Sequence, residues 1–140
     1  MDLDYIIGLF VYPPFWSAVL TVVQLSLLAW VISVIAGMAV ALGRTSAPRI
    51  PRALLGAYVW FFRSLPLLVL IVFVYNAPQM FPALRAIVGD PFTAGLLALV
   101  LSETAYISEI HRGGLLSVAV GQGEAARALG LRWRSAQLHI

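Results

Sequence analysis

Three long apolar stretches alternate with short polar segments along this chain. The first stretch, residues 15–43, contains no charged side chain. At about 1.5 Å per residue, a helix over this stretch is longer than the ~30 Å hydrocarbon core of a bilayer, so we expect it to tilt or to extend beyond the core. Pro13 and Pro14 come directly before the stretch and mark its start. The pattern predicts a first membrane-spanning helix here.

Two further spans are predicted at about 53–75 and 92–111. The earlier one is interrupted by Pro66, whose ring and missing N–H kink or break a helix. Between the two spans, residues 76–91 are rich in proline and glycine, and their single arginine and single aspartate cancel in charge. This composition predicts an outer loop that could hold a short surface helix. The chain is therefore predicted to be an all-α, multi-span transmembrane protein.

Composition supports the assignment to a membrane. Hydrophobic residues make up 61% of the 140 residues, charged residues 11%, and the mean hydropathy is +0.94. Soluble domains, in contrast, carry about 25% charged residues. The chain has no cysteine, which excludes a disulfide framework, a thiolate metal site and a cysteine nucleophile.

The positions of the arginines predict how the spans are oriented. All nine basic residues are arginines, and seven of them lie in residues 44–52 and 112–140, against one in the predicted outer loop. Arginine-rich loops are retained on the cytoplasmic side, so three spans with the N-terminus outside and the C-terminus inside are expected. The net charge of +3 then reflects membrane topology and gives no reason to expect a nucleic-acid partner.

The C-terminal twenty residues predict two short helices with a break at Gly130. Strong helix formers occupy 124–129, and glycine can adopt the left-handed conformation that ends a helix. Beyond the break, Trp133, Ala136 and Ile140 fall three and four apart, on one helical face. By pattern alone, a solvated helical hairpin beside a membrane and a functional segment are both open interpretations.

A long ordered motif begins near the end of the third predicted span. Its residues follow the pattern A-Y-x-x-E-I-x-R-G-G-x-x-S-V-x-x-G-Q-x-E-A-A-x-A-L-G-L from Ala105 to Leu131. The run resembles permease subunits of polar amino-acid ABC importers, in the family of binding-protein-dependent transport system inner-membrane components. The matching residues around the end of the span are Tyr106, Glu109, Arg112, Gly113 and Gly114.

The resemblance continues on both sides of this run. The E-A-A sequence is followed at the family's spacing by a glycine and then an isoleucine, as in the cytoplasmic loop of these permeases. Upstream, residues 62–68 read F-R-S-L-P-L-L and are similar to the family's F-R-G-T-P-L-L, with Ser64 and Leu65 in place of glycine and threonine. This chain keeps the proline that kinks the helix, but it lacks the glycine that would allow a close backbone approach at position 64.

The resemblance implies a role in coupling to ATP hydrolysis. In the family the E-A-A loop forms coupling helices that insert into a groove on an ATPase subunit. The residues implied in this docking are Gly121, Gln122, Glu124, Ala125, Ala126, Arg127, Gly130 and Ile140. The implied partners are a second permease subunit, two ATPase subunits and an extracytoplasmic substrate-binding protein, at a bacterial inner membrane. The chain has no G-x-x-x-x-G-K-[ST] loop, so ATP is expected on the partners, and neither an enzyme nor a cofactor or metal site is expected here.

The resemblance covers nearly all of this chain but about three-fifths of a family permease. Family members have about five spans and continue with x-L-P after the isoleucine, so residues 1–140 are expected to be a single permease domain without its C-terminal spans. A truncated, non-transporting remnant or a small interaction subunit that keeps the docking loop is therefore the alternative function. A secondary transporter or channel is disfavoured, because the run from Ala105 to Leu131 has no role without an ATPase to dock.

Two ionisable residues are predicted inside the bilayer. Counting about 1.5 Å per residue, Arg63 lies ~15 Å from the cytoplasmic edge and Glu103 ~16 Å from the outer edge, which is nearly the same depth. A lone charge there costs at least about 3 kcal/mol, so the two are candidates to pair. Two interpretations stay open: a structural ion pair between spans, and a polar site on the translocation path, together with Pro66, for a zwitterionic substrate.

The two histidines give no catalytic signal. His111 and His139 are predicted near the inner surface, and neither has a carboxylate or serine partner at a suggestive spacing. We expect both to be interfacial polar residues.

The arginine distribution makes the topology testable by cysteine labelling, since the natural chain contains no cysteine. A cysteine at Asn76 or Asp90 should react with a membrane-impermeant thiol reagent in intact cells, whereas a cysteine at Arg49 should react only after permeabilisation. A reporter fused after Ile140 should be cytoplasmic. Labelling of position 49 but not 90 in intact cells would reverse the orientation.

Overall fold

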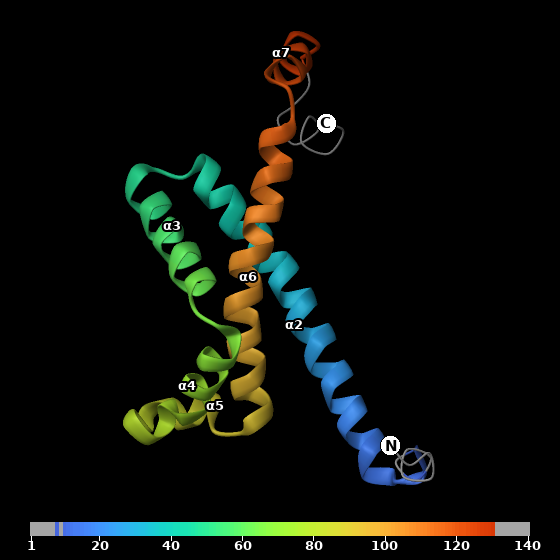
Figure 1. Ribbon diagram of the computed structural model, residues 1–140. Helices are drawn as coiled ribbons and strands as arrows, with labels where there is room; N and C mark the ends of the chain where they lie inside the picture. Colours follow the sequence, from blue (N-terminus) through green and yellow to red (C-terminus); the bar gives the residue numbers. More distant parts are fainter. Residues whose placement is uncertain (1–7, 9, 131–140) are drawn as a thin grey trace.

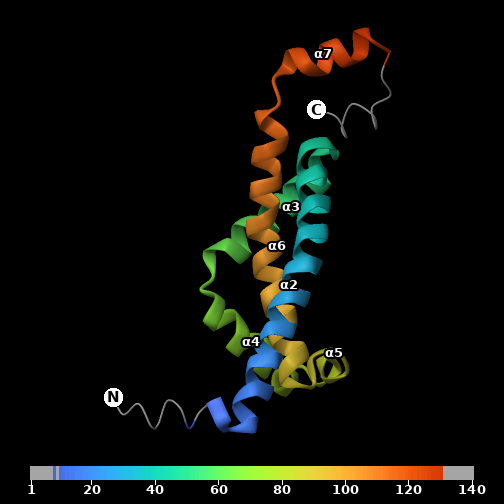
Figure 2. The ribbon, with the colours of Figure 1, turned by 90° about the vertical axis from the view of Figure 1, so that its right-hand side faces the viewer.

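The computed structural model describes residues 8 and 10–130, and over this range it is helical with no strand. Two long helices, α2 (Pro13–Ser46) and α6 (Pro91–Ser117), run in the same direction side by side (Figures 1 and 2). Both are long and apolar enough to cross a membrane, and α3 (Arg49–Ser64) with α4 (Leu67–Met80) would make a third span if this bent pair is counted as one. The predicted all-α, membrane-spanning class is confirmed.

The break predicted at Pro66 is larger than a kink. Helices α3 and α4 meet at an angle of 105°. Pro66 disfavours the helical conformation of the residue before it, and Leu65 accordingly has an extended backbone, with φ −89° and ψ 132°. The pair still carries the chain from the end of α2 back to the start of α6 (Figure 1).

A compact connector joins α4 to α6. It consists of the short 3₁₀ helix η1 (Pro82–Leu84) and the single turn α5 (Arg85–Val88). Asp90 caps α6 by accepting a hydrogen bond from the Thr93 N–H at 3.0 Å, and Pro91 stands in the first turn, where a missing N–H costs nothing. The Thr93 hydroxyl and its backbone N–H together hold the pKa of the Asp90 carboxyl below its usual value.

Small residues form the contact between α2 and α6, the most extensive one between helices. One face of α2 buries Ala29, Ser33, Gly37 and Ala41, each four residues apart. Helices in lipid associate through such close packing, since apolar area alone gives no driving force there. The approach is closest at Gly37, where an added Cβ would lie 2.9 Å from Ile107 Cγ2 and 3.1 Å from the Ser108 backbone nitrogen.

Side-chain hydroxyls tie both neighbouring helices to the middle of α6. Ser33 of α2 donates to the Val100 carbonyl at 3.4 Å, and Tyr58 of α3 donates to the Leu101 carbonyl at 2.7 Å. Each bond uses the second lone pair of a helical carbonyl. Three helices are therefore joined within one turn of α6.

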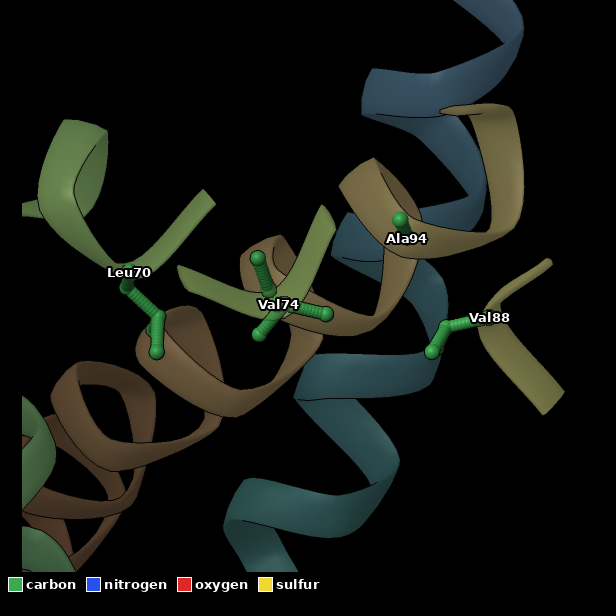
Figure 3. Close-up of a cluster of buried hydrophobic side chains, with 5 residues drawn as sticks. Leu70, Val74, Val88 and Ala94 are labelled. Atoms are coloured by element: carbon green, nitrogen blue, oxygen red, sulfur yellow. The ribbon is translucent and has the colours of Figure 1, made fainter. Parts of the chain in front are cut away.

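A second apolar cluster holds the bent helix against the first half of α6. Leu70 and Val74 of α4, Val88 of α5, and Ala94 and Ala98 of α6 are buried together. Figure 3 shows the side chains of Leu70, Val74 and Val88 gathered around the part of α6 that carries Ala94. This cluster fixes where α4 lies after the 105° break.

Helix α6 is longer than the predicted third span. It continues to Ser117, beyond the predicted end at 111, so Arg112, Gly113 and Gly114 lie within the helix and not in the loop after it. Two glycines weaken a helix by about 1 kcal/mol each. Glu109 and Arg112 stand three residues apart and form an ion pair that supports this last part of the helix.

The close approach at Gly37 predicts that the same glycine-to-alanine change has different effects on thermal stability at Gly37 and at Gly95. Gly37→Ala should lower the thermal midpoint in detergent, since overpacking costs about 1–3 kcal/mol. Gly95→Ala is the matched control: its Cβ would lie 3.8 Å from Leu25 Cδ2, an ordinary contact, and alanine is the better helix former. Equal midpoints for the two variants would show that α2 and α6 do not approach as closely as described.

Candidate functional site

The E-A-A residues lie on a short helix beyond the end of α6. After Ser117 the backbone leaves the helical conformation at Val118, with φ −67° and ψ 122°, and α7 (Val120–Ala128) begins two residues later. Helix α7 turns away from the axis of α6 (Figures 1 and 2). We call residues 118–130 the coupling segment, after the role that the resemblance implies for the E-A-A residues.

All the predicted docking residues except Ile140 lie on this segment. Glu124 and Ala125 are exposed, as are Gly121 and Gln122 one turn earlier, whereas Ala126 is buried. Arg127 lies in α7. The helix was predicted from Glu124 and in fact begins one turn earlier. An exposed helix of this kind is available for contact with another protein.

Gly130 adopts the left-handed conformation predicted for it. Its φ is +71°, and within the described residues it is the glycine with a positive φ. No atom lies within 4 Å of where its Cβ would stand, so backbone conformation and not lack of space requires glycine here. A Cβ in this conformation costs roughly 1–2 kcal/mol. The predicted second helix, with Ile140, lies outside the described residues.

A cluster of three charged side chains joins the end of α2 to α6. Glu109 accepts hydrogen bonds from Arg112 Nε at 3.0 Å and Arg112 Nη2 at 2.6 Å, and it also forms an ion pair with Arg44 Nη1. The three side chains are between 20% and 33% exposed, so solvent and salt screen them only in part. We call these residues the Arg44–Glu109–Arg112 cluster.

Sequence reasoning missed this cluster although it selected two of its members. Glu109 and Arg112 were predicted as motif residues, and Arg44 was counted only as one of three loop arginines. The signal was available in their positions. Arg44 follows directly on the first apolar stretch, and Glu109 is the acidic residue nearest the end of the third, so both lie at the same predicted membrane edge.

Arg63 and Glu103 do not pair in the structure. The described residues form two ion pairs, and Glu109 is the acidic partner in both. The Arg63 guanidinium carbon instead lies 5.4 Å from the centroid of the Tyr106 ring, and the Tyr106 hydroxyl donates to the Arg63 carbonyl at 3.3 Å. The depth count compared positions across the membrane only and left open the direction in which each side chain points around its helix axis.

Several polar groups lie around the break between α3 and α4. Arg63 is exposed at the end of α3, Pro66 begins α4 as its N-cap, and Glu103 is half-buried on α6, one turn before Tyr106. Nearby on α6, the Thr104 hydroxyl oxygen is buried without a hydrogen bond within the described part of the chain. Such groups in a membrane protein face the protein interior or a water-filled cavity.

The described residues contain no group of three or more His, Asp or Glu side chains placed to hold a metal ion. His111 is half-buried near the end of α6, and its Nδ1 has no hydrogen-bond partner in the described part of the chain. His139 lies outside the described residues. The described part of the chain presents an exposed helix and a polar region but no catalytic grouping.

These features define a multi-span helical membrane protein whose last long helix leads into a short exposed helix. Residues 33–140 match the family described as binding-protein-dependent transport system inner membrane component, and this chain belongs to that family. It is therefore an inner-membrane protein and not an enzyme, since ATP hydrolysis in such systems is carried out by separate ATPase subunits.

Relatives with curated descriptions are transport permeases. The chain is 39% identical over 137 residues to the nopaline transport system permease protein of Agrobacterium fabrum, which covers 94% of this chain and 56% of that protein. It is 40% identical over 116 residues to a probable glutamine ABC transporter permease protein of Bacillus subtilis, covering 82% and 51%. The chain thus spans about half the length of the curated relatives it matches.

A solved structure shares the fold. The crystal structure of an amino acid ABC transporter with histidines superposes with a TM-score of 0.78 at 34% identity, over 97% of this chain and 62% of that one. The arrangement of α2, the bent α3–α4 pair and α6 is therefore that of an ABC-transporter membrane subunit.

The geometry around Arg63 predicts which double-mutant cycle shows coupling. Arg63→Ala and Tyr106→Leu should be coupled by about 0.5–1 kcal/mol in unfolding free energy, the usual size of an exposed cation–π contact. Arg63→Ala and Glu103→Ala should be additive, because the two side chains form no ion pair. Thermal unfolding of the single and double variants in detergent measures both cycles. Coupling confined to the Arg63–Glu103 pair would contradict the structure.

Proposed function

We propose that this chain is the membrane-spanning subunit of an ABC importer for a polar amino acid or a close analogue. The observation that carries the proposal is the exposed helix α7, which follows α6 along the chain, bears the E-A-A residues and ends two residues before the left-handed Gly130. The printed functions of the relatives, nopaline and glutamine transport, support the substrate class.

In this proposal the coupling segment docks on an ATPase subunit. Glu124 is its one acidic side chain and is exposed, so it can pair with a basic residue of the partner's groove. Gly130 sets the direction in which the chain leaves α7, because its positive φ produces a turn that other residues reach only with strain. ATP-driven closure of two ATPase subunits would move the segment and, with it, the end of α6.

The proposed assembly follows from the same role. Two permease subunits, two ATPase subunits and an extracytoplasmic substrate-binding protein would form the working importer, with ATP bound by the ATPase subunits and no cofactor in this chain. The arginine distribution supports an orientation with α7 on the cytoplasmic side and the connector of η1 and α5 on the outer side.

The polar groups at the helix break are the proposed translocation-path residues. A break leaves backbone N–H groups at the start of α4 without partners in their own helix. With the cationic Arg63 before the break and the anionic Glu103 on the adjacent α6, the region offers groups of both signs to a zwitterion. Pro66 maintains the break, because it has no N–H to continue the helix.

The coupling role is tested by Glu124→Lys and Gly130→Val in the assembled, reconstituted transporter. Both should reduce the stimulation of ATP hydrolysis by loaded binding protein by about 5- to 150-fold, the usual range of coupling between sites. Membrane insertion and binding-protein affinity should stay unchanged, since both residues are exposed on the coupling segment. The assay compares ATPase rates in vesicles with and without loaded binding protein.

Two control variants separate coupling from general damage. Gly56→Val places the same side chain in open space, at a glycine with an ordinary helical backbone on α3, and should keep full stimulation. Glu124→Gln removes the charge without reversing it and should have the smaller effect of the two changes at that position.

Full stimulation and uptake in both Glu124→Lys and Gly130→Val would refute the coupling role. Association with the ATPase without any uptake in the unaltered protein would favour the alternative, a non-transporting subunit that keeps the docking segment.

A further inference from the structure

The ion pair between Arg44 and Glu109 is the ionic contact between α2 and α6 in the described structure. Arg44 lies in the last turn of α2, two residues before its end at Ser46. Glu109 lies two turns before α6 ends and the coupling segment begins. The pair therefore joins the first span to α6 directly before the part of the chain that contacts the proposed ATPase partner.

Arg44 is not needed to neutralise Glu109. Arg112, on the same helix as Glu109, already donates two hydrogen bonds to Glu109 Oε2, while Arg44 contacts the other carboxylate oxygen, Oε1. One arginine that donates two charge-assisted hydrogen bonds to a carboxylate already balances its single negative charge. What the second arginine adds is a connection between two helices.

Beyond the cluster, α6 projects without support from α2. An added Cβ at Gly113 or Gly114 would meet no atom within 4 Å, and Leu116 is 63% exposed. On the other side of the cluster, α2 and α6 are in tight contact through Gly37, Ile107 and Ser108. The Arg44–Glu109 pair is thus placed where the rigid helix pair ends and the free part of α6 begins.

We propose that Arg44 is a positioning residue for coupling: its ion pair with Glu109 makes the end of the first span move together with the coupling segment. The inference rests on the proposed function and adds a link that the docking motif does not contain. A force applied to α7 acts on the free end of α6. The ion pair transmits this force to α2 at a point nearer to α7 than the packed contact at Gly37. Without the pair, the free end of α6 would bend relative to α2.

The decisive variants change Arg44 and leave the docking surface untouched. In the assembled transporter, Arg44→Gln should keep the ATPase subunit bound and keep basal hydrolysis, yet reduce its stimulation by loaded binding protein by about fivefold or more. Arg44→Lys keeps a cation at this position and should restore most of the stimulation. Arg49→Gln is the matched control, because Arg49 is an exposed arginine near the end of α2 that forms no ion pair within the described residues.

A distance measurement tests the inference in the otherwise unaltered transporter. The chain has no cysteine, so spin labels can be placed at Ser46 and Leu116, both exposed and near the ends of α2 and α6. With Arg44 present, the label-to-label distance should be the same in the nucleotide-free and ATP-bound states. In Arg44→Gln the distance should change or broaden when ATP binds.

The outcomes distinguish this inference from the proposed function. Loss of stimulation in Arg44→Gln with the ATPase still bound, rescued by Arg44→Lys, supports the positioning role. Equal effects of Arg44→Gln and Arg49→Gln, or a distance that changes with nucleotide while Arg44 is present, would overturn it and leave the docking role of α7 intact. An unaltered chain that does not bind the ATPase subunit would instead refute the proposed function itself.

Discussion

The close packing of α2 against α6 is the contact on which the remaining structure depends. Water drives little association between helices in a bilayer, so the fit of small residues decides which faces meet. Gly37 and the alanines and serine in register with it let the two backbones approach, and α6 then serves as the reference for every other helix. Tyr58 attaches α3 to it, and Leu70 and Val74 attach α4.

The features that depend on local chemistry could be predicted from the sequence. An uninterrupted apolar stretch predicts a span because unpaired backbone groups are too costly in lipid. Pro66 predicts a break because its ring acts on the residue directly before it, and Leu65 is extended as a result. Gly130 predicts a helix end for a similar reason, and its positive φ agrees. In each case the cause and the effect lie within a few residues.

The features that depend on relative helix orientation could not be predicted. Arg63 was matched with Glu103 by depth alone, but depth does not fix the direction of a side chain around its helix axis, and the Arg63 guanidinium lies over the Tyr106 ring. The Arg44–Glu109 pair needs a particular rotation of two helices about their axes, which the sequence pattern leaves free. The continuation of α6 to Ser117, beyond the predicted span, is supported by the Glu109–Arg112 ion pair.

The left-handed backbone at Gly130 also limits which sequences this position can reach in evolution. A single base change in a glycine codon leads to alanine, valine, serine, cysteine, arginine, tryptophan, aspartate or glutamate, each of which brings a Cβ. Asparagine, which tolerates this backbone region, needs more than one change. Aspartate is reachable and also tolerates the region, but it would place a negative charge at the C-terminal end of α7, where the helix dipole disfavours it. Each amino-acid replacement that one base change can make at Gly130 is therefore expected to destabilise the turn after α7. The genetic code, as well as sterics, favours retention of glycine at this position.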